Sequence, residues 1–489
     1  MPVQAQRRRD ALQIRDAVLS STVSSPRKSV GFAWLPVAAC GELAGALDVA
    51  ALQRVFARVA RRHDALRARL SRVSSSQEGD CDESRTLVLF EAVPQPELVL
   101  ERCASRLDAR ARAQAMHAAY DKDPYGARLF EARLFCCEHD AVHVLYLRAN
   151  HCVADGWSHQ LFYAQLVEAY NTDGESDDES DGGVRCADFL AQREALQRSR
   201  ACERTPAVAQ QRAAYALAER LPCSWPTVCA REDVTATLAC SGALLRSSQL
   251  AQLSCDETRR VAHVLDSCKG ACGGCSLPSA LLAAYLYALD RLHTEEDCDH
   301  QKGLVQYSHS GRIGHSELSR VYGQLATDMN VLAPLGPADA SLASVLARAH
   351  AAVLESLALA NVPYALAYAS ARDAQQPLPP IFNWYDRYTQ VPSWRAVEAT
   401  EVPLDNAPLA DKTFNTAALY LMGLVQADGS LFLKFFFNEQ VYARDTVQRA
   451  LDRIKVFLKR VAENDLPSPP PPKTQQYLRE VLTTTTTTG

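Results

Sequence analysis

The sequence lacks any run of 18 or more apolar residues, although 47% of its 489 residues are hydrophobic. Because a helix needs about 20 mainly apolar residues to cross a bilayer, no membrane span is expected. A basic excess is missing too: 52 lysines and arginines stand against 57 aspartates and glutamates, a net charge of −5. Proteins that bind nucleic acid usually carry a strong basic excess, so nucleic acid is not expected as a partner.

The amino terminus lacks the apolar stretch of a secretory signal. Its first residues, MPVQAQRRRDALQIRDAV, are rich in arginine, but Asp10 and Asp16 do not fit a mitochondrial presequence, which is poor in acidic residues. The 16 cysteines are therefore expected to be reduced thiols in a cytoplasmic protein. Such thiols usually pack as small apolar side chains.

Several short catalytic motifs are also missing. The sequence contains no GxSxG, P-loop or HExxH string, so it gives no sign of a nucleophile elbow, a phosphate-binding loop or a zinc-protease helix. The string GGCS at 273–276 lacks the rest of a carrier-protein serine motif. Any catalytic chemistry must come from another pattern.

The length is about three times that of an average domain and predicts two sizeable lobes. We expect a poorly ordered amino terminus over residues 1–30, a first lobe over 31–185 and a second lobe over 186–466. The tail, residues 467–489, contains prolines at 469–472 and six threonines at 483–488. This composition predicts a disordered linker.

Apolar periodicity places elements in the first lobe. Asp48 is suited to cap a helix, whose inner face would carry residues spaced by three and four, namely Leu52, Val55, Phe56 and Val59. The segment 141–150 has apolar residues on both sides and predicts a strand buried on both faces. It leads into the loop HCVADGW and then into a helix, for which Ser158 is the expected cap.

The second lobe repeats helices and strands. Residues 279–292 predict a helix that leads into the strand GLVQYSHS. Near the end, two apolar strands flank Asp428 and Gly429, which predicts a hairpin because this pair tolerates positive φ. A helix from Ala443 to about Ala462 is expected to close the fold.

The most informative string is HCVADG at 151–156, between the buried strand and the helix. His151 could exchange protons near neutral pH, and the strand and helix would hold it still. Asp155 is better placed to turn inward and pair with a cation, and Gly156 to let the backbone turn into the helix. A histidine at a strand end is more often structural, so the surrounding sequence decides between the two interpretations.

That surrounding sequence resembles the condensation domains of non-ribosomal peptide synthetases, members of the HxxxDG acyltransferase superfamily. The resemblance runs over nearly the whole chain, with the features in the family's order. They are RHDALRARL at 62–70, DPYGARLFEARLF at 123–135, NHCVADGWS at 150–158, DFLAQREALQRS at 188–199, VQYSHSGR at 305–312, FNWYDR at 382–387 and DGSLFLKFFFNEQVY at 428–442.

The resemblance implies an α/β (α+β) fold with two chloramphenicol-acetyltransferase-like lobes. Each would be a mixed sheet flanked by helices, and the lobes would form a V with a central tunnel. It also implies that His151 is catalytic, that Asp155 is structural and pairs with Arg312, and that Gly156 and Trp157 complete the motif. Breaking such a buried ion pair on one side costs about 3 to 5 kcal/mol.

The implied reaction is attack of an amine or hydroxyl on a phosphopantetheine thioester. The thioester would arrive on an acyl- or peptidyl-carrier protein or as acyl-coenzyme A, and the acceptor would be a small amine or alcohol. No permanently bound cofactor and no metal are expected, and the protein is expected to act as a monomer. The resemblance names neither the acyl group nor the acceptor.

Three departures from the family pattern stand out. Asn150 occupies the place of the first histidine of the family's pair, a place that usually looks structural. Residues 15–45 lack the family's opening segment. The segment GQLATDMNVLAPL at 323–335 has no asparagine at the position where the family has one, and it lacks the family's final arginine. These changes predict an unusual donor or acceptor side.

Two other functions are also consistent with the HxxxDG motif. One is a coenzyme A-dependent alcohol O-acyltransferase, which shares HxxxDG. The other is a degenerate, non-catalytic docking module, although such modules tend to lose the His or Asp that this chain keeps.

A separate string, CKGACGGC, spaces Cys268, Cys272 and Cys275 as in [4Fe–4S] radical enzymes. It lies in a glycine-rich loop with no matching barrel pattern, so reduced or zinc-binding thiols are favoured there.

Overall fold

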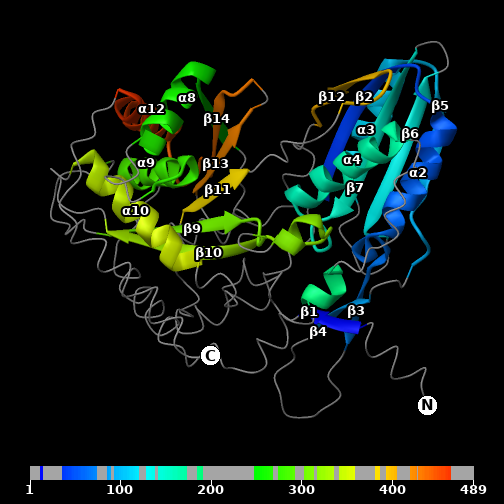
Figure 1. Ribbon diagram of the computed structural model, residues 1–489, viewed down its shortest axis with the longest axis horizontal. Coiled ribbons are helices and arrows are strands. Elements are labelled where there is room, and N and C mark those ends of the chain that lie inside the picture. Colours follow the sequence, from blue (N-terminus) through cyan, green and yellow to red (C-terminus); the bar gives the residue numbers. More distant parts are fainter. Residues whose placement is uncertain are drawn as a thin grey trace.

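The structure, a computed structural model, describes part of the chain. Its ranges are residues 11–14, 36–73, 85–89, 93–120, 128–137, 141–172, 184–190, 247–267, 274–291, 302–312, 316–334, 341–357, 380–385, 393–404, 419–426 and 428–463. Two lobes, each with its own sheet, lie next to each other (Figure 1). No helix in these ranges is long and apolar enough to cross a membrane.

The first lobe is built on a five-stranded sheet of order β12-β2-β7-β6-β5. The strands are β2 (Pro36–Gly45), β5 (Leu98–Cys103), β6 (Phe130–Cys137), β7 (Val142–Asn150) and β12 (Val397–Glu401). Its helices are α2 (Val49–Arg61), α3 (Arg106–Ala118) and α4 (Gly156–Asn171). Helices α2 and α4 share one apolar cluster with the sheet and α3 shares another, so the sheet is sandwiched between them.

A small antiparallel sheet of order β1-β4-β3 accompanies this lobe. Its strands are β1 (Ala11–Ile14), β3 (Arg69–Val73) and β4 (Arg85–Leu89), and the 3-10 helix η3 (Asp64–Arg67) precedes β3. Strand β1 lies within residues 1–30, where a poorly ordered terminus was expected. The expected tail, 467–489, lies outside the described residues.

The second lobe is built on a six-stranded mixed sheet of order β10-β9-β11-β13-β14-β8. The strands are β8 (Ser247–Leu253), β9 (Lys302–His309), β10 (Thr327–Pro334), β11 (Ile381–Tyr385), β13 (Leu419–Val425) and β14 (Leu431–Phe437). Its helices are α8 (Cys255–Ser267), α9 (Leu277–Arg291), α10 (Leu342–Leu357) and α12 (Arg444–Ala462).

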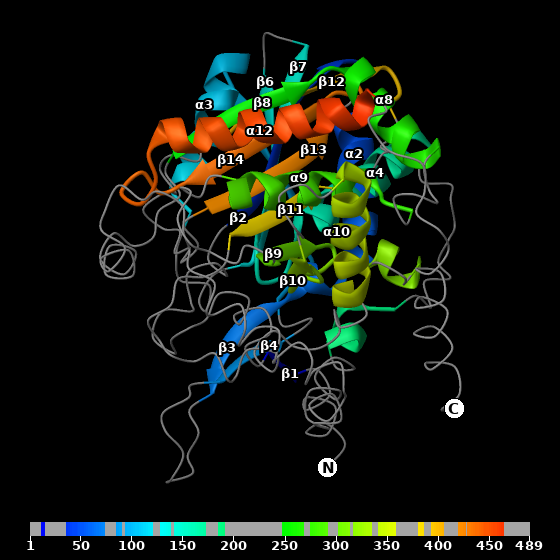
Figure 2. The same ribbon diagram turned by 90° about the vertical axis from the view of Figure 1, so that its left-hand side faces the viewer.

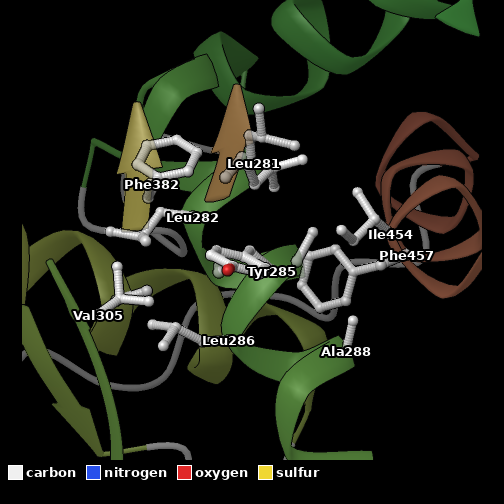
Figure 3. Packing of buried hydrophobic residues seen from close by; sticks show 14 of the residues in the cluster. Leu281, Leu282, Tyr285, Leu286, Ala288, Val305, Phe382, Ile454 and Phe457 are labelled. Atoms are coloured by element: carbon white, nitrogen blue, oxygen red, sulfur yellow. The ribbon is translucent and has the colours of Figure 1, made fainter. Parts of the chain in front are cut away.

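The four described helices of the second lobe lie on the face of its sheet that points away from the first lobe (Figures 1 and 2). Helix α9 is sandwiched between the sheet and α12. Its Tyr285 contacts Phe382 and Phe435 of the sheet, with ring centroids 6.3 and 5.5 Å away, and Ile454 and Phe457 of α12 pack on its outer side (Figure 3). The opposite face of the sheet points towards the first lobe.

Two segments from the second half of the chain lie in the first lobe. Strand β12 pairs antiparallel with β2 and forms an edge of the first sheet. The 3-10 helix η6 (Ser316–Arg320) and the residues that follow it contribute Leu318, Val321, Tyr322 and Leu325 to the first lobe's core. The first lobe therefore contains segments from both halves of the chain, and neither lobe is one unbroken half.

Several local predictions are confirmed. The Asp48 side chain accepts a hydrogen bond from the Ala51 N–H at the start of α2, and the four predicted apolar residues of that helix are each at most 3% exposed. Strands β13 and β14 form the predicted hairpin, with Gly429 at φ +82°. The closing helix begins at Arg444, with Ala443 at its cap position, and ends at Ala462.

Candidate functional site

The HxxxDG string forms the connection between strand β7 and helix α4. Asp155, not Ser158, is the N-cap: its carboxylate accepts the Ser158 N–H at 2.8 Å, and the Ser158 hydroxyl in turn lies 3.3 Å from the Asp155 N–H. The prediction of Ser158 as the cap was therefore wrong by one turn. The two side chains cap each other, which fixes the point at which the loop becomes a helix.

The Asp155 carboxylate is 2% exposed and pairs with Arg312 from the second half of the chain. The distance from Nη1 of the arginine to Oδ2 of the aspartate is 2.8 Å. The backbone N–H groups of Leu325 and Ala326 donate to the same oxygen at 3.1 and 3.0 Å. The Ser158 hydroxyl donates to the other oxygen at 2.7 Å. The predicted buried ion pair is present and joins the motif to a segment more than 150 residues away.

The terminal nitrogens of the arginine make further hydrogen bonds, whereas its buried Nε has no partner among the described residues. Its guanidinium donates to the carbonyl groups of Ser310, Val321 and Gly323 at 2.9, 3.1 and 3.3 Å. Burial by itself would raise the pKa of Asp155, but the charge of Arg312 and the hydrogen bonds from Arg312 and Ser158 outweigh it and hold that pKa below its usual value. The carboxylate is therefore charged at neutral pH.

His151 lies at the start of this fixed loop and is only partly buried. Its Nδ1 lies 3.2 Å from Oε1 of Gln324, a residue just after η6. The amide nitrogen of Gln324 lies 3.4 Å from the Ala326 carbonyl oxygen, which fits an amide whose oxygen faces the imidazole. Because an amide oxygen only accepts hydrogen bonds, this contact favours a proton on Nδ1 and the lone pair on Nε2.

Asn150 has a different environment from its neighbour. It is 3% exposed, its side-chain oxygen accepts the Cys152 N–H at 2.9 Å, and its side-chain nitrogen donates to the Tyr120 hydroxyl. A neutral imidazole also offers one acceptor and one donor, so an asparagine can take over both bonds of a histidine at this place. The geometry gives Asn150 a structural position beneath the loop.

Gly156 is required for a reason other than the predicted one. It is not among the residues with positive φ. A Cβ at this position would lie 3.0 Å from Cε1 of Tyr385, at the end of strand β11. The glycine therefore allows a second-lobe side chain to approach the first turn of α4.

Trp157 follows the glycine and also joins distant segments. Its indole nitrogen donates to the Ser319 carbonyl at 3.0 Å, and the Arg312 guanidinium carbon lies 5.9 Å from the centroid of its ring. Asp155, Gly156 and Trp157 thus each contact a segment from the second half of the chain. The motif lies at the junction of the two lobes.

Among the described residues, no group of three or more His, Cys, Asp or Glu side chains is arranged to hold a metal ion. Cys275 is 4% exposed and packs in the second lobe's core. Cys268 and Cys272 lie outside the described residues.

Sequence reasoning missed Gln324, Tyr385 and Tyr120. Gln324 lies within the segment 323–335, which was noted only for departing from the family pattern. Tyr385 lies within FNWYDR, which was used only as a family feature. Each reaches the motif through tertiary folding, so no local spacing could have identified it.

Comparison with known proteins agrees with this architecture. The family model described as Condensation domain matches residues 33–216. A comparison with curated proteins found no match.

Solved structures with similar folds span nearly the whole chain. The condensation domain from the monacolin K polyketide synthase MokA is 14% identical, with a TM-score of 0.68 over 93% of this chain and 98% of that one. The epimerization domain from the third module of tyrocidine synthetase B is 13% identical, with a TM-score of 0.66 over 93% and 98%. The X-domain from teicoplanin biosynthesis is 18% identical, with a TM-score of 0.64 over 91% and 95%. Residues 33–216 thus match the family model described as Condensation domain, and the described chain has the fold of condensation domains.

Proposed function

We propose that the chain is a condensation-type acyltransferase that joins an amine or hydroxyl to an acyl group held as a phosphopantetheine thioester. The observation that supports this most is the way the HxxxDG loop is held. The buried pair of Asp155 and Arg312 fixes the loop, while His151 stays partly exposed at the junction of the lobes. Such a fixed, accessible imidazole suits proton transfer.

In the proposed reaction, the N–H or O–H of the acceptor hydrogen-bonds to Nε2 of His151. The acceptor atom forms a new bond to the thioester carbonyl carbon as its proton passes to the imidazole. The carbon–sulfur bond then breaks, and the proton goes to the departing thiolate, which gives an amide or ester and a free thiol. Gln324 would hold the ring in the tautomer that this sequence needs.

The thioester would be delivered by a carrier protein or by coenzyme A. Under this proposal, donor and acceptor meet in a passage between the lobes that ends at His151. The alcohol O-acyltransferase alternative is narrower, because it takes only an alcohol as acceptor and only coenzyme A as the carrier of the acyl group. A trial with both kinds of donor and both kinds of acceptor therefore separates the two.

The test is acyl transfer by wild type and by His151→Ala. Each protein is incubated with acylated carrier proteins or acyl-coenzyme A pools and a set of amines and alcohols, and products are measured by intact mass spectrometry. Loss of a positioned base should lower the rate by about 100-fold or more. The exposed His263 of α8 gives the matched control, His263→Ala, which should keep the wild-type rate. Full activity in His151→Ala would contradict the proposal.

One observation favours a second candidate, a docking module. An X-domain of this fold has been solved in a complex with OxyB; it is 18% identical, with a TM-score of 0.61 over 88% of this chain and 89% of that one. If this chain works by docking alone, no donor and acceptor pair would give a product. The retained His151, Asp155 and Arg312 favour catalysis instead.

A further inference from the structure

The second sheet has an inner face, the face on which none of the described helices of this lobe lies. It points towards the first lobe (Figures 1 and 2). Along β14, Leu433 and Phe435 are fully buried under the helices, and Lys434 between them is only partly buried. Strand alternation assigns nine side chains of β11, β13 and β14 to the inner face: Ile381, Asn383, Tyr385, Tyr420, Met422, Leu424, Phe432, Lys434 and Phe436.

The inner face begins at the HxxxDG motif. Tyr385 is 36% exposed, and its ring approaches Gly156 so closely that a Cβ there would meet Cε1 at 3.0 Å. Leu424 and Phe432 follow Tyr385 on the neighbouring strands in register. The inner face therefore lies next to the loop that carries His151.

The inner face is mainly apolar and aromatic. Tyr420 and Phe436 are direct cross-strand partners, and their rings meet edge to face with centroids 5.5 Å apart. Lys434 lies beside them, with Nζ 4.6 Å from the centroid of Phe436. Its cross-strand partners are Met422 and Leu250, which are both uncharged.

Lys434 is the one charged side chain among the nine that define the inner face. No carboxylate of the described residues lies within ion-pair distance of its ammonium group. A partly buried cation loses hydration, and an aromatic ring compensates for that loss only in part. This position therefore fits an anion supplied by a bound molecule.

We infer that the inner face binds a substrate with an apolar or aromatic portion followed by an anionic group, and that Lys434 pairs with this group. The inference rests on the proposed function, because it uses His151 as the reacting end. Lys434 lies two strands over and two residues along from Tyr385, a separation of about 12 Å between Cα atoms from standard sheet spacings. The anion would be a carboxylate of the acyl or acceptor compound or the phosphate of the phosphopantetheine arm.

The test is a binding experiment with two pairs of probes that differ only in charge. One pair is phenylhexanoate and phenylhexanamide, and the other is phosphopantetheine and pantetheine. Dissociation constants are measured by isothermal titration calorimetry at low ionic strength. For at least one pair, wild type should bind the anion about tenfold more tightly than its neutral partner, the size expected of a charge-assisted hydrogen bond.

Lys434→Gln should remove that preference, and Lys434→Arg, which keeps the charge, should retain most of it. The matched control is Lys455→Gln on α12, on the far side of the sheet, which should behave as wild type. Thermal melting of each variant checks that it is folded. The pair of probes that responds identifies carboxylate or phosphate as the anion.

Two results would overturn the inference: no preference for either anion in wild type, or an undiminished preference in Lys434→Gln. Binding needs no turnover, so His151→Ala should keep the preference. A charge-dependent site with no acyl transfer would remove the proposed reaction but keep the anion site. Acyl transfer without charge-dependent binding would support the proposed reaction and remove the anion site.

Discussion

Neighbouring residues at the end of β7 have different tasks. Asn150 is enclosed and has both ends of its amide bonded, whereas His151 keeps part of its surface accessible. The family resemblance predicted this division, because the place of Asn150 usually looks structural and His151 takes the place of the motif's second histidine. The partners of the two residues, Tyr120 and Gln324, could not be predicted, since they come from other elements and carry no motif.

A second histidine near the motif provides a residue-scale test. His159 in the first turns of α4 is 6% exposed, and burial lowers its pKa to about 4. The unfolded chain binds a proton at this residue below about pH 6.5, whereas the folded chain does so only near pH 4. Stability is therefore lost as the pH falls through this window, by about 2 kcal/mol at pH 5 from this residue alone.

We expect His159→Gln to flatten the fall in unfolding free energy between pH 7 and pH 5. Urea unfolding at the two pH values measures it. His143 and His350 also have a lowered pKa through burial, so part of the slope should remain. The exposed His263 serves as control, since His263→Gln should leave the profile unchanged. An unaltered slope in His159→Gln would mean that this imidazole is accessible to protons in the folded state.

At the scale of elements, local patterns predicted which segments form helices and strands, but not every end. The capping aspartate of α2 and the Asp428-Gly429 hairpin follow from local chemistry alone. The start of α4 was misplaced because Ser158 and Asp155 are both good capping residues. The pairing of β12 with β2 could not be predicted, because the two strands are about 350 residues apart in the chain.

At the end of β2, next to the start of β12, the backbone conformation and the close approach of the two segments require a glycine. Gly45 has φ +118°, and a Cβ there would lie 2.6 Å from the Ala396 carbonyl oxygen. We expect Gly45→Ala to lower the unfolding free energy by about 2 kcal/mol or more, because strain and overlap add. Gly41 of the same strand is the matched control: its φ is not positive, and a Cβ there would be 3.6 Å from the Thr400 oxygen. Equal losses in Gly45→Ala and Gly41→Ala, measured by thermal melting, would refute this account of the turn.

At the scale of the whole molecule, Asp155 and Arg312 join the lobes. The family resemblance predicted their pairing, but not the backbone N–H groups of Leu325 and Ala326, which a comparison of side chains does not reveal. Removal of the carboxylate leaves a buried guanidinium without its counterion. The loss is therefore expected to affect both lobes.

We expect Asp155→Ala to lower the unfolding free energy by about 3 to 5 kcal/mol. Because the pKa of Asp155 is lowered in the fold, its contribution in wild type is present at neutral pH and is lost as the pH falls through the acid range. Thermal melting at pH 7 and in acid measures both effects. Asp256→Ala, at an ion pair with 70% exposed side chains, should change little. Unchanged melting in Asp155→Ala would rule out a stabilising role for the pair.

The passage of β12 and the η6 segment into the first lobe limits how relatives of this fold can exchange parts. A fragment that stops at residue 216, where the family match ends, would leave β2 as a bare sheet edge and Asp155 without its cation. A chimera that joins two related chains at a single position would take the two parts of the first lobe from different proteins. Recombination that preserves the fold would have to transfer residues 312–326 and 393–404 together with the amino-terminal portion.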